Sequence, residues 1–175
     1  GYLYANLLGN VAGRIIYDGG GLIASGGELL ARGARLAFAP MVLSTAVIDI
    51  ESNRREQARR GSHRPRHDAE AAVIDVPFAW PKRRAEAPAN IAASWEDGRA
   101  VREEEFARAV SLGLWDYLRK SRSHGYVVSI SGGADSAACV VLIALAARLA
   151  AAELGWPKVQ AALSYIPAVK ALPTD

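Results

Sequence analysis

Cysteine is almost absent from this sequence. The 175 residues include one cysteine, Cys139, so the chain cannot form a disulfide framework or a cysteine-rich zinc site of its own. This composition is typical of a reducing compartment, and we expect a cytoplasmic protein. Cys139 falls within an apolar run, which predicts a small core residue rather than a nucleophile.

A charged leader and a long hydrophobic run are also missing. The chain begins at Gly1 inside the apolar run 2–5 and stops at Asp175 without completing a further element, so we expect no signal or transit peptide and a sequence truncated at both ends. The apolar run 137–147 has eleven residues before Arg148 interrupts it, which is too short to span a bilayer. We therefore expect no membrane partner.

Negative charge is scarce in one region. The whole chain has a modest net charge of +3, but between residues 54 and 66 only Glu56 opposes a cluster of arginines. The members of this cluster are Arg54, Arg55, Arg59, Arg60, Arg64 and Arg66. No aromatic residue lies between them and no nucleic-acid-binding motif surrounds them, which favours a solvated helix and linker over a site for nucleic acid or another anion.

The first fifty residues contain short apolar segments separated by glycine turns. We expect strands at 2–8, 15–17, 22–24, 28–31 and 41–50. The pairs Asp18-Gly19 and Gly26-Gly27 predict hairpins, because such turns need the positive φ that glycine adopts readily. The segment 41–50 is rich in β-branched residues, which indicates a strand buried on at least one face.

The remainder of the chain divides by composition. Residues 51–62 are polar and tolerate a helix, whereas 63–100 mix prolines, charges and small residues without periodicity. Apolar residues at helical spacing predict an amphipathic helix over 101–123. We therefore predict two domains, 1–62 and 101–175, joined by a linker at 63–100.

A strand, a glycine-containing loop and a long alanine-rich helix are predicted at 126–130, 131–135 and 136–154. Gly132 and Gly133 let the backbone approach phosphate oxygens, and the N-terminus of the following helix presents unpaired N–H groups. Ser131 and Ser136 add hydroxyl donors, and Asp135 can hold Mg²⁺. This pattern indicates a site for a nucleotide phosphate.

Two familiar phosphate-binding motifs do not fit this loop. A Walker A loop needs Lys followed by Ser or Thr, and a dinucleotide fingerprint needs three glycines spaced as G-x-G-x-x-G. The other interpretation is a plain tight turn in which Ser136 or Asp135 caps the helix. The strand before the loop and the helix after it favour the phosphate site, with the helix buried against a parallel sheet.

The loop 131–136 (SGGADS) resembles that of the ATP-pyrophosphatases, and its surroundings narrow the resemblance. Residues 113–121 (GLWDYLRKS) and 125–130 are similar to the entry of the NAD synthetase domain. Residues 2–10 (YLYANLLGN), 17–20 and 23–27 resemble the late strands of the nitrilase-type glutaminase that precedes that domain. The chain as a whole resembles a piece of the glutamine-dependent NAD synthetases.

The resemblance implies an α/β architecture throughout. It consists of the end of a nitrilase-like α/β sandwich, a linker, and the first βα unit of a Rossmann-like ATP-pyrophosphatase domain. It also implies a two-step reaction in which ATP adenylates the nicotinate carboxylate of deamido-NAD and releases pyrophosphate, after which ammonia from glutamine displaces AMP. The cofactors would be ATP and Mg²⁺, and the substrates deamido-NAD, ATP and glutamine.

Site residues carry over from the family only at the loop. The ATP phosphates would be held by Ser131, Gly132, Gly133, Asp135 and Ser136, with Asp135 also a magnesium ligand and none of these residues a covalent catalyst. The Glu, Lys and Cys triad of the glutaminase is expected upstream of Gly1, and the deamido-NAD contacts and second metal ligand after Asp175. The piece alone is expected to be inactive, and the whole enzyme to be a homo-oligomer that binds no nucleic acid.

Some alternatives stay open at this point. Tyr2, Tyr4 and Asn6 either line the glutaminase pocket or belong to a core strand. The chain could also come from another ATP-pyrophosphatase amidotransferase, such as a GMP or asparagine synthetase. The sequence also does not exclude a domain that binds an adenine nucleotide without catalysis, or a remnant without independent activity.

Overall fold

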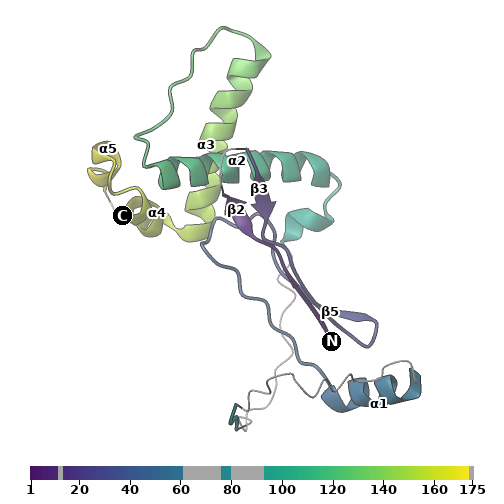
Figure 1. Ribbon diagram of the computed structural model, residues 1–175. Coiled ribbons are helices and arrows are strands. Elements are labelled where there is room, and N and C mark those ends of the chain that lie inside the picture. The colour runs from purple at the N-terminus through teal and green to yellow at the C-terminus, as the bar shows by residue number, and fades with distance from the viewer. Residues whose placement is uncertain (12–13, 61–75, 80–92, 174–175) are drawn as a thin grey trace.

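The computed structural model describes residues 1–11, 14–60, 76–79 and 93–173, and shows a mixed α/β chain in which short strands precede the helices (Figure 1). The strands are β1 (Tyr2–Ala5), β2 (Leu8–Asn10), β3 (Ile16–Asp18), β4 (Gly21–Ser25) and β5 (Glu28–Arg32). The helices are α1 (Ile50–Arg60), the 3₁₀ turn η1 (Ser94–Asp97), α2 (Val101–Ser121), α3 (Ala134–Leu154), α4 (Trp156–Ala162) and α5 (Pro167–Lys170).

The first four strands form one long antiparallel ribbon. β1 pairs with β4 and β2 pairs with β3. Between the two pairs, the N–H of Asn6 donates to Gly20 O and the N–H of Gly19 donates to Leu7 O, each at 2.9 Å. The predicted hairpin at Asp18-Gly19 is therefore wrong: these residues lie inside the ribbon, where Gly19 with φ +72° makes an irregularity instead of a turn.

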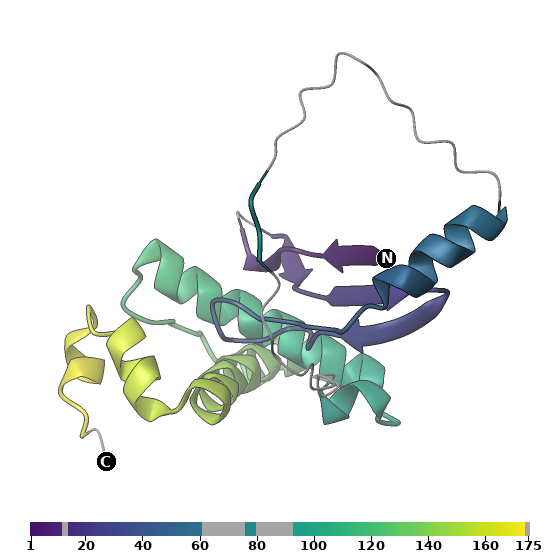
Figure 2. The same cartoon turned by 90° about the horizontal axis from the view of Figure 1, so that it is seen from below.

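The second hairpin is confirmed. β4 and β5 pair antiparallel, with Ser25 opposite Glu28 across the turn Gly26-Gly27. Both turn glycines have positive φ, 62° and 88°, as a two-residue hairpin of this kind requires. Helix α1 lies beside this hairpin (Figure 2), where the side chains of Asn53 and Ser25 are hydrogen-bonded.

Two predicted strands do not form. In segment 41–49 alternate residues are less exposed, as in a strand, and in 126–130 the side chains of Val127 and Ile130 are largely exposed. Neither segment belongs to a sheet. A strand is defined by hydrogen bonds to a neighbour, and in the described residues no neighbouring strand is paired with either segment. The predictions over 41–50 and 126–130 were therefore wrong for this structure.

Helix α2 confirms the amphipathic prediction, ending at Ser121 because Arg122 adopts a left-handed conformation with φ +54°. Its buried face carries Leu112 and Trp115, which pack with Leu36 and Phe38 from the segment after β5. The rings of Phe38 and Trp115 lie 6.5 Å apart. The rest of this core comes from Ala150, Val159, Leu163 and Ile166. One hydrophobic core thus joins the N-terminal segment to helices that begin after residue 100.

Helix α3 crosses α2 and extends beyond it toward the loop that precedes it (Figure 1). By length and composition alone it could cross a membrane, with a mean hydropathy of 2.1, but this is weak evidence because core helices pass the same test. Only 11% of its apolar window is buried, so the prediction of a helix buried against a sheet is wrong here. Cys139 is exposed, not a core residue, because no described segment covers this part of the helix.

The arginine cluster is solvated as predicted, as far as the structure describes it. Helix α1 has no buried residue, and its arginines pair within the helix, with Arg54 3.0 Å from Glu51 and Arg59 3.7 Å from Glu56. Arg64 and Arg66 lie outside the described residues, as does most of the predicted linker. Within the described part of that linker, η1 contributes the buried side chain of Glu96.

Candidate phosphate loop and the links around it

The predicted phosphate loop is held by its own hydroxyl groups. The Oγ of Ser136 donates to Gly133 O at 3.1 Å and lies 3.3 Å from the Oγ of Ser131. The backbone N–H of Ser131 donates to the same Ser136 Oγ at 3.3 Å, and the N–H of Gly133 donates to Ser131 Oγ at 3.4 Å. The two serines therefore close a small ring at the start of α3.

The helix begins two residues earlier than predicted, at Ala134. Its N-cap is Gly133, which has no side chain to cap the first N–H groups. The interpretation of Ser136 or Asp135 as the cap is therefore wrong. Because the first N–H groups of an α-helix have no acceptor within the helix, this end is open to an anion.

The loop is open to solvent. Ser131, Gly132, Gly133 and Asp135 are exposed, and Ser136 is half-buried. Gly132 has φ +83°, and a Cβ placed on it would meet no atom within 4 Å. The structure thus brings all the predicted loop residues together on one exposed surface that a phosphate group can reach.

Asp135 is the acidic residue in the first turn of α3. Among the described residues no group of three or more His, Cys, Asp or Glu side chains is placed to hold a metal ion. Asp135 alone cannot hold Mg²⁺ as a protein cage would. It fits the other way in which proteins bind this ion, through one or two carboxylates together with substrate phosphates and water.

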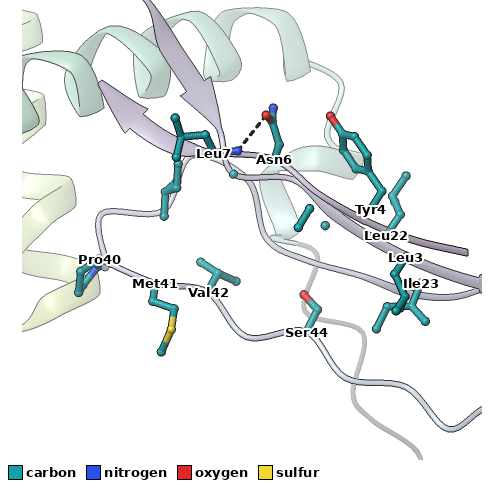
Figure 3. Close-up of a pocket in the computed structure, with 14 residues that line it drawn as sticks. Leu3, Tyr4, Asn6, Leu7, Leu22, Ile23, Pro40, Met41, Val42 and Ser44 are labelled. Carbon is teal, nitrogen blue, oxygen red and sulfur yellow. Dashed lines mark hydrogen bonds between the residues drawn. The ribbon is translucent and has the colours of Figure 1, made fainter. Parts of the chain in front are cut away.

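A separate cavity of about 410 Å³ lies between the ribbon and the segment 40–44 (Figure 3). It is mostly apolar, and Tyr4 and Asn6 are among the residues that line it. The Asn6 side chain is engaged locally, because it accepts the N–H of Leu7 at 2.9 Å and donates to Asp18 at 2.7 Å. Tyr2 and Tyr4 are exposed, so the core-strand interpretation is wrong, and a role for these residues in a glutaminase pocket stays a prediction.

Three carboxylates that the sequence analysis missed link the N-terminal segment to the later helices. Glu96 accepts from Arg32 at 2.5 Å and from Arg35 at 3.0 Å. Asp116 accepts the backbone N–H of Asn10 at 2.9 Å. Glu153 accepts the N–H groups of Phe38 and Ala39, each at 3.0 Å. The sequence held one clue to these links: Asp116 is a charged residue on the otherwise apolar face of the predicted amphipathic helix.

Two of these carboxylates have lowered pKa values. Burial alone would raise the pKa of Asp116, but hydrogen bonds from Lys120 at 2.8 Å, from Arg119 at 2.7 Å and from the Asn10 backbone outweigh it and lower that pKa. Burial would likewise raise the pKa of Glu96, but hydrogen bonds from Arg35 and from the backbone of Ala93 outweigh it and lower that pKa. Both groups are held in their charged form.

Comparison with solved structures shows that this α/β chain has a known counterpart. It matches the crystal structure of a glutamine-dependent NAD(+) synthetase from Cytophaga hutchinsonii with a TM-score of 0.58 and 33% identity, over 99% of this chain and 22% of that one. The match therefore includes both the ribbon and the loop. No protein-family model matches the chain.

Curated relatives agree with the structural match. The glutamine-dependent NAD(+) synthetase of Oryza sativa subsp. indica is 30% identical over 165 residues, which is 87% of this chain and 21% of the relative. The human enzyme of the same name is 31% identical over 81% of this chain and 20% of its own length. This chain thus spans about a fifth of the length of the relatives it matches. Over that stretch it is homologous to the glutamine-dependent NAD(+) synthetases.

Proposed function

We propose that the protein carrying this chain is a ligase that makes NAD from deamido-NAD with ATP and with ammonia released from glutamine. ATP transfers its adenylyl group to the nicotinate carboxylate and pyrophosphate leaves; ammonia then attacks the acyl carbon and AMP leaves with its bonding electron pair. The observation that carries the proposal is the 33% identity to a solved synthetase over 99% of this chain, which includes the exposed phosphate loop.

In this reaction the loop binds the ATP phosphates. The open N-terminus of α3 offers backbone N–H groups, and Ser131 and Ser136 offer hydroxyl groups now bonded to each other 3.3 Å apart. The bare Gly132 and Gly133 let a phosphate approach the main chain. Asp135 would hold Mg²⁺ jointly with phosphate oxygens. When bound, the metal would neutralise charge on the departing pyrophosphate.

The same proposal gives the chain a layout. The antiparallel ribbon is taken as the end of a nitrilase-like glutaminase sandwich, and the segment 126–130, the loop and α3 as the first βα unit of a Rossmann-like sheet. Support comes from the alternating burial of 41–49 and from the exposed apolar side chains of Val127 and Ile130, which suit segments that pair with further strands. Domain limits at 62 and 100 stay part of this proposal.

We further propose a cytoplasmic homo-oligomer that uses small-molecule substrates and binds neither nucleic acid nor membrane. The pairing of Arg54 with Glu51 and of Arg59 with Glu56 supports the exclusion of nucleic acid, because each glutamate offsets one arginine charge on α1. Sedimentation of the purified protein tests the oligomeric state, and sedimentation with added DNA or anionic vesicles tests the expected lack of binding to each.

The function is tested with the protein expressed from its complete reading frame. Deamido-NAD, MgATP and either glutamine or ammonium chloride are supplied, and NAD and pyrophosphate are measured together. We expect equal amounts of both products, with pyrophosphate release dependent on deamido-NAD. Pyrophosphate release dependent on another acceptor substrate would show a different amidotransferase, and ATP binding without turnover would show a binding module.

A loop variant connects the activity to this site. Ser131→Ala removes one hydroxyl from the ring and should raise the KM for ATP in both the glutamine-fed and the ammonia-fed reaction. Ser164→Ala, which changes an exposed serine outside the loop, is the matched control. An unchanged KM for ATP in the Ser131 variant would contradict the assignment of the loop.

A further inference from the structure

A buried ionic contact fixes the ribbon to helix α2. Asp116 accepts the backbone N–H of Asn10 at 2.9 Å, and the ammonium group of Lys120, one helical turn later, donates both to Asp116 at 2.8 Å and to the backbone carbonyl of Asn10. Two side chains of one helix therefore hold both polar groups of a single peptide segment. We call Asp116, Lys120 and the backbone of Gly9 and Asn10 the ribbon clamp.

The clamp depends on glycine at position 9. Gly9 has φ +84°, and a Cβ built on it would lie 2.1 Å from the Oδ2 of Asp116. No side chain fits there while Asp116 keeps its place. The helix and the ribbon thus approach so closely at this point that not even a methyl group fits between them.

A contact of this kind is a poor way to gain stability alone. Asp116 and Asn10 are only 4% and 6% exposed, so the carboxylate is removed from water, which costs free energy. Its hydrogen-bond partners mainly offset that desolvation cost. What the clamp adds is direction and register, because hydrogen bonds to one peptide allow a single position of the ribbon on α2.

The clamp lies between the two parts of the chain that the proposed function assigns to different steps. On one side is the ribbon, compared above with the ammonia-supplying part. On the other is α2, which contacts α3, the helix that follows the phosphate loop, through the Ser111 hydroxyl and Leu142 O at 3.4 Å. Asp116 and Lys120 are therefore among the contacts that set the position of the ribbon on α2 and, through α3, relative to the loop.

We propose that Asp116 and Lys120 are positioning residues for the transfer of ammonia. They hold the glutamine-hydrolysing part in a fixed position relative to the ATP site. This inference rests on the proposed function. It assigns them no role in either chemical step: their loss should let ammonia escape to solvent before it reaches the adenylate.

The test uses Asp116→Asn in the protein expressed from its complete reading frame. Asparagine keeps the shape but removes the charge that Lys120 and Arg119 pair with. We expect NAD formation with saturating ammonium chloride to stay within about twofold of the parent, and NAD formation with glutamine to fall roughly tenfold. Glutamine hydrolysis should continue, so the ratio of glutamate to NAD should rise by a similar factor.

Two further variants keep the test sharp. Lys120→Met retains the aliphatic stem of the side chain. Because this side chain is half-exposed, the variant should fold even if the Asp116 variant does not. We expect a smaller rise in the ratio of glutamate to NAD. Glu104→Gln breaks the partly buried ion pair with Arg108 on the same helix, at 2.8 Å, and should leave the ratio unchanged. A rise of the ratio in the Glu104 variant would overturn the specific role of the clamp.

A double-mutant cycle shows whether the contact itself is responsible. Gly9→Ala should raise the ratio because its methyl group displaces Asp116, and adding Gly9→Ala to Asp116→Ala should change the ratio less than it does in the parent. Equal loss of ammonia-fed and glutamine-fed activity in the clamp variants would overturn this inference but leave the proposed function intact. No NAD from either nitrogen source in the parent protein would overturn both.

Discussion

The surface between the ribbon and α2 and the surface around the phosphate loop use polar groups in opposite ways. At the ribbon, Asp116 and Glu96 are buried and each accepts several hydrogen bonds, including one from Asn10 to Asp116 across 106 residues and one from Arg32 to Glu96 across 64 residues. At the loop, Ser131 and Ser136 bond only to each other and to neighbouring backbone. At the first surface the carboxylates take their hydrogen bonds from the chain itself, whereas at the second the donors lie where a ligand can reach them.

The largest effect should come from the core beneath the ribbon. Trp115→Ala removes a side chain only 4% exposed and should lower the free energy of unfolding by about 3–5 kcal/mol. Val140→Ala, on the exposed part of α3, should cost about 0.5 kcal/mol or less. Urea unfolding followed by circular dichroism measures both. Equal losses would break the contrast between the two surfaces.

Acid should weaken the ribbon surface next. The pKa values of Asp116 and Glu96 are lowered in the folded chain, so the unfolded chain binds more protons as the pH falls below about 4–5. Their contribution is complete above the unfolded pKa values and is lost as the pH falls through the folded ones. Unfolding free energies measured from pH 7 to pH 3 should show this loss, and a double variant, Glu96→Gln with Asp116→Asn, should flatten the curve.

A substitution in the phosphate loop should change the affinity for ATP and leave the free energy of unfolding unchanged. Asp135→Asn changes an exposed side chain, so the unfolding midpoint should stay where it is. The affinity for ATP should fall roughly tenfold in the presence of Mg²⁺ and change little when the metal is chelated. Calorimetric titration of ATP compares the two conditions, with Asp97→Asn as an exposed control; an equal fall under both would remove Asp135 as a metal ligand.

The smallest effect belongs to the arginine-rich helix. Arg54→Ala removes an ion pair in which both side chains are 70% exposed, and should cost about 0.5 kcal/mol or less. Thermal unfolding at low and high salt should give nearly the same difference from the parent. A loss comparable with that of the Trp115 variant would mean that α1 packs on something beyond the described residues.

What the sequence predicted well was local. The periodicity of α2, the long apolar helix α3 and the Gly26-Gly27 hairpin all depend on residues close together in the chain. The strands expected at 41–50 and 126–130 failed because a strand requires a partner, and sequence alone does not say whether one is present. Cys139 was misplaced for the same reason, since an apolar run does not reveal what covers it.

The candidate site divides in the same manner. The five loop residues could be predicted as a group, because glycines and serines at this spacing form a short recognisable motif, and their role in binding ATP stays a prediction. The ribbon clamp was not, because Asn10 and Asp116 are separated by 106 residues and nothing in either neighbourhood names the other. Asp116 could only have been noted as a charge on a buried helical stripe.

The long sequence separation of these links has a consequence for the order in which the chain folds. Helices α2, α3 and α4 meet through neighbours along the chain and can associate early, whereas Phe38 reaches Glu153 across 115 residues. Closing a chain segment of that size costs entropy before any contact repays it. We therefore expect the helices to gain protection from amide hydrogen exchange first during refolding, and the ribbon to be the last part to dock and the first to detach.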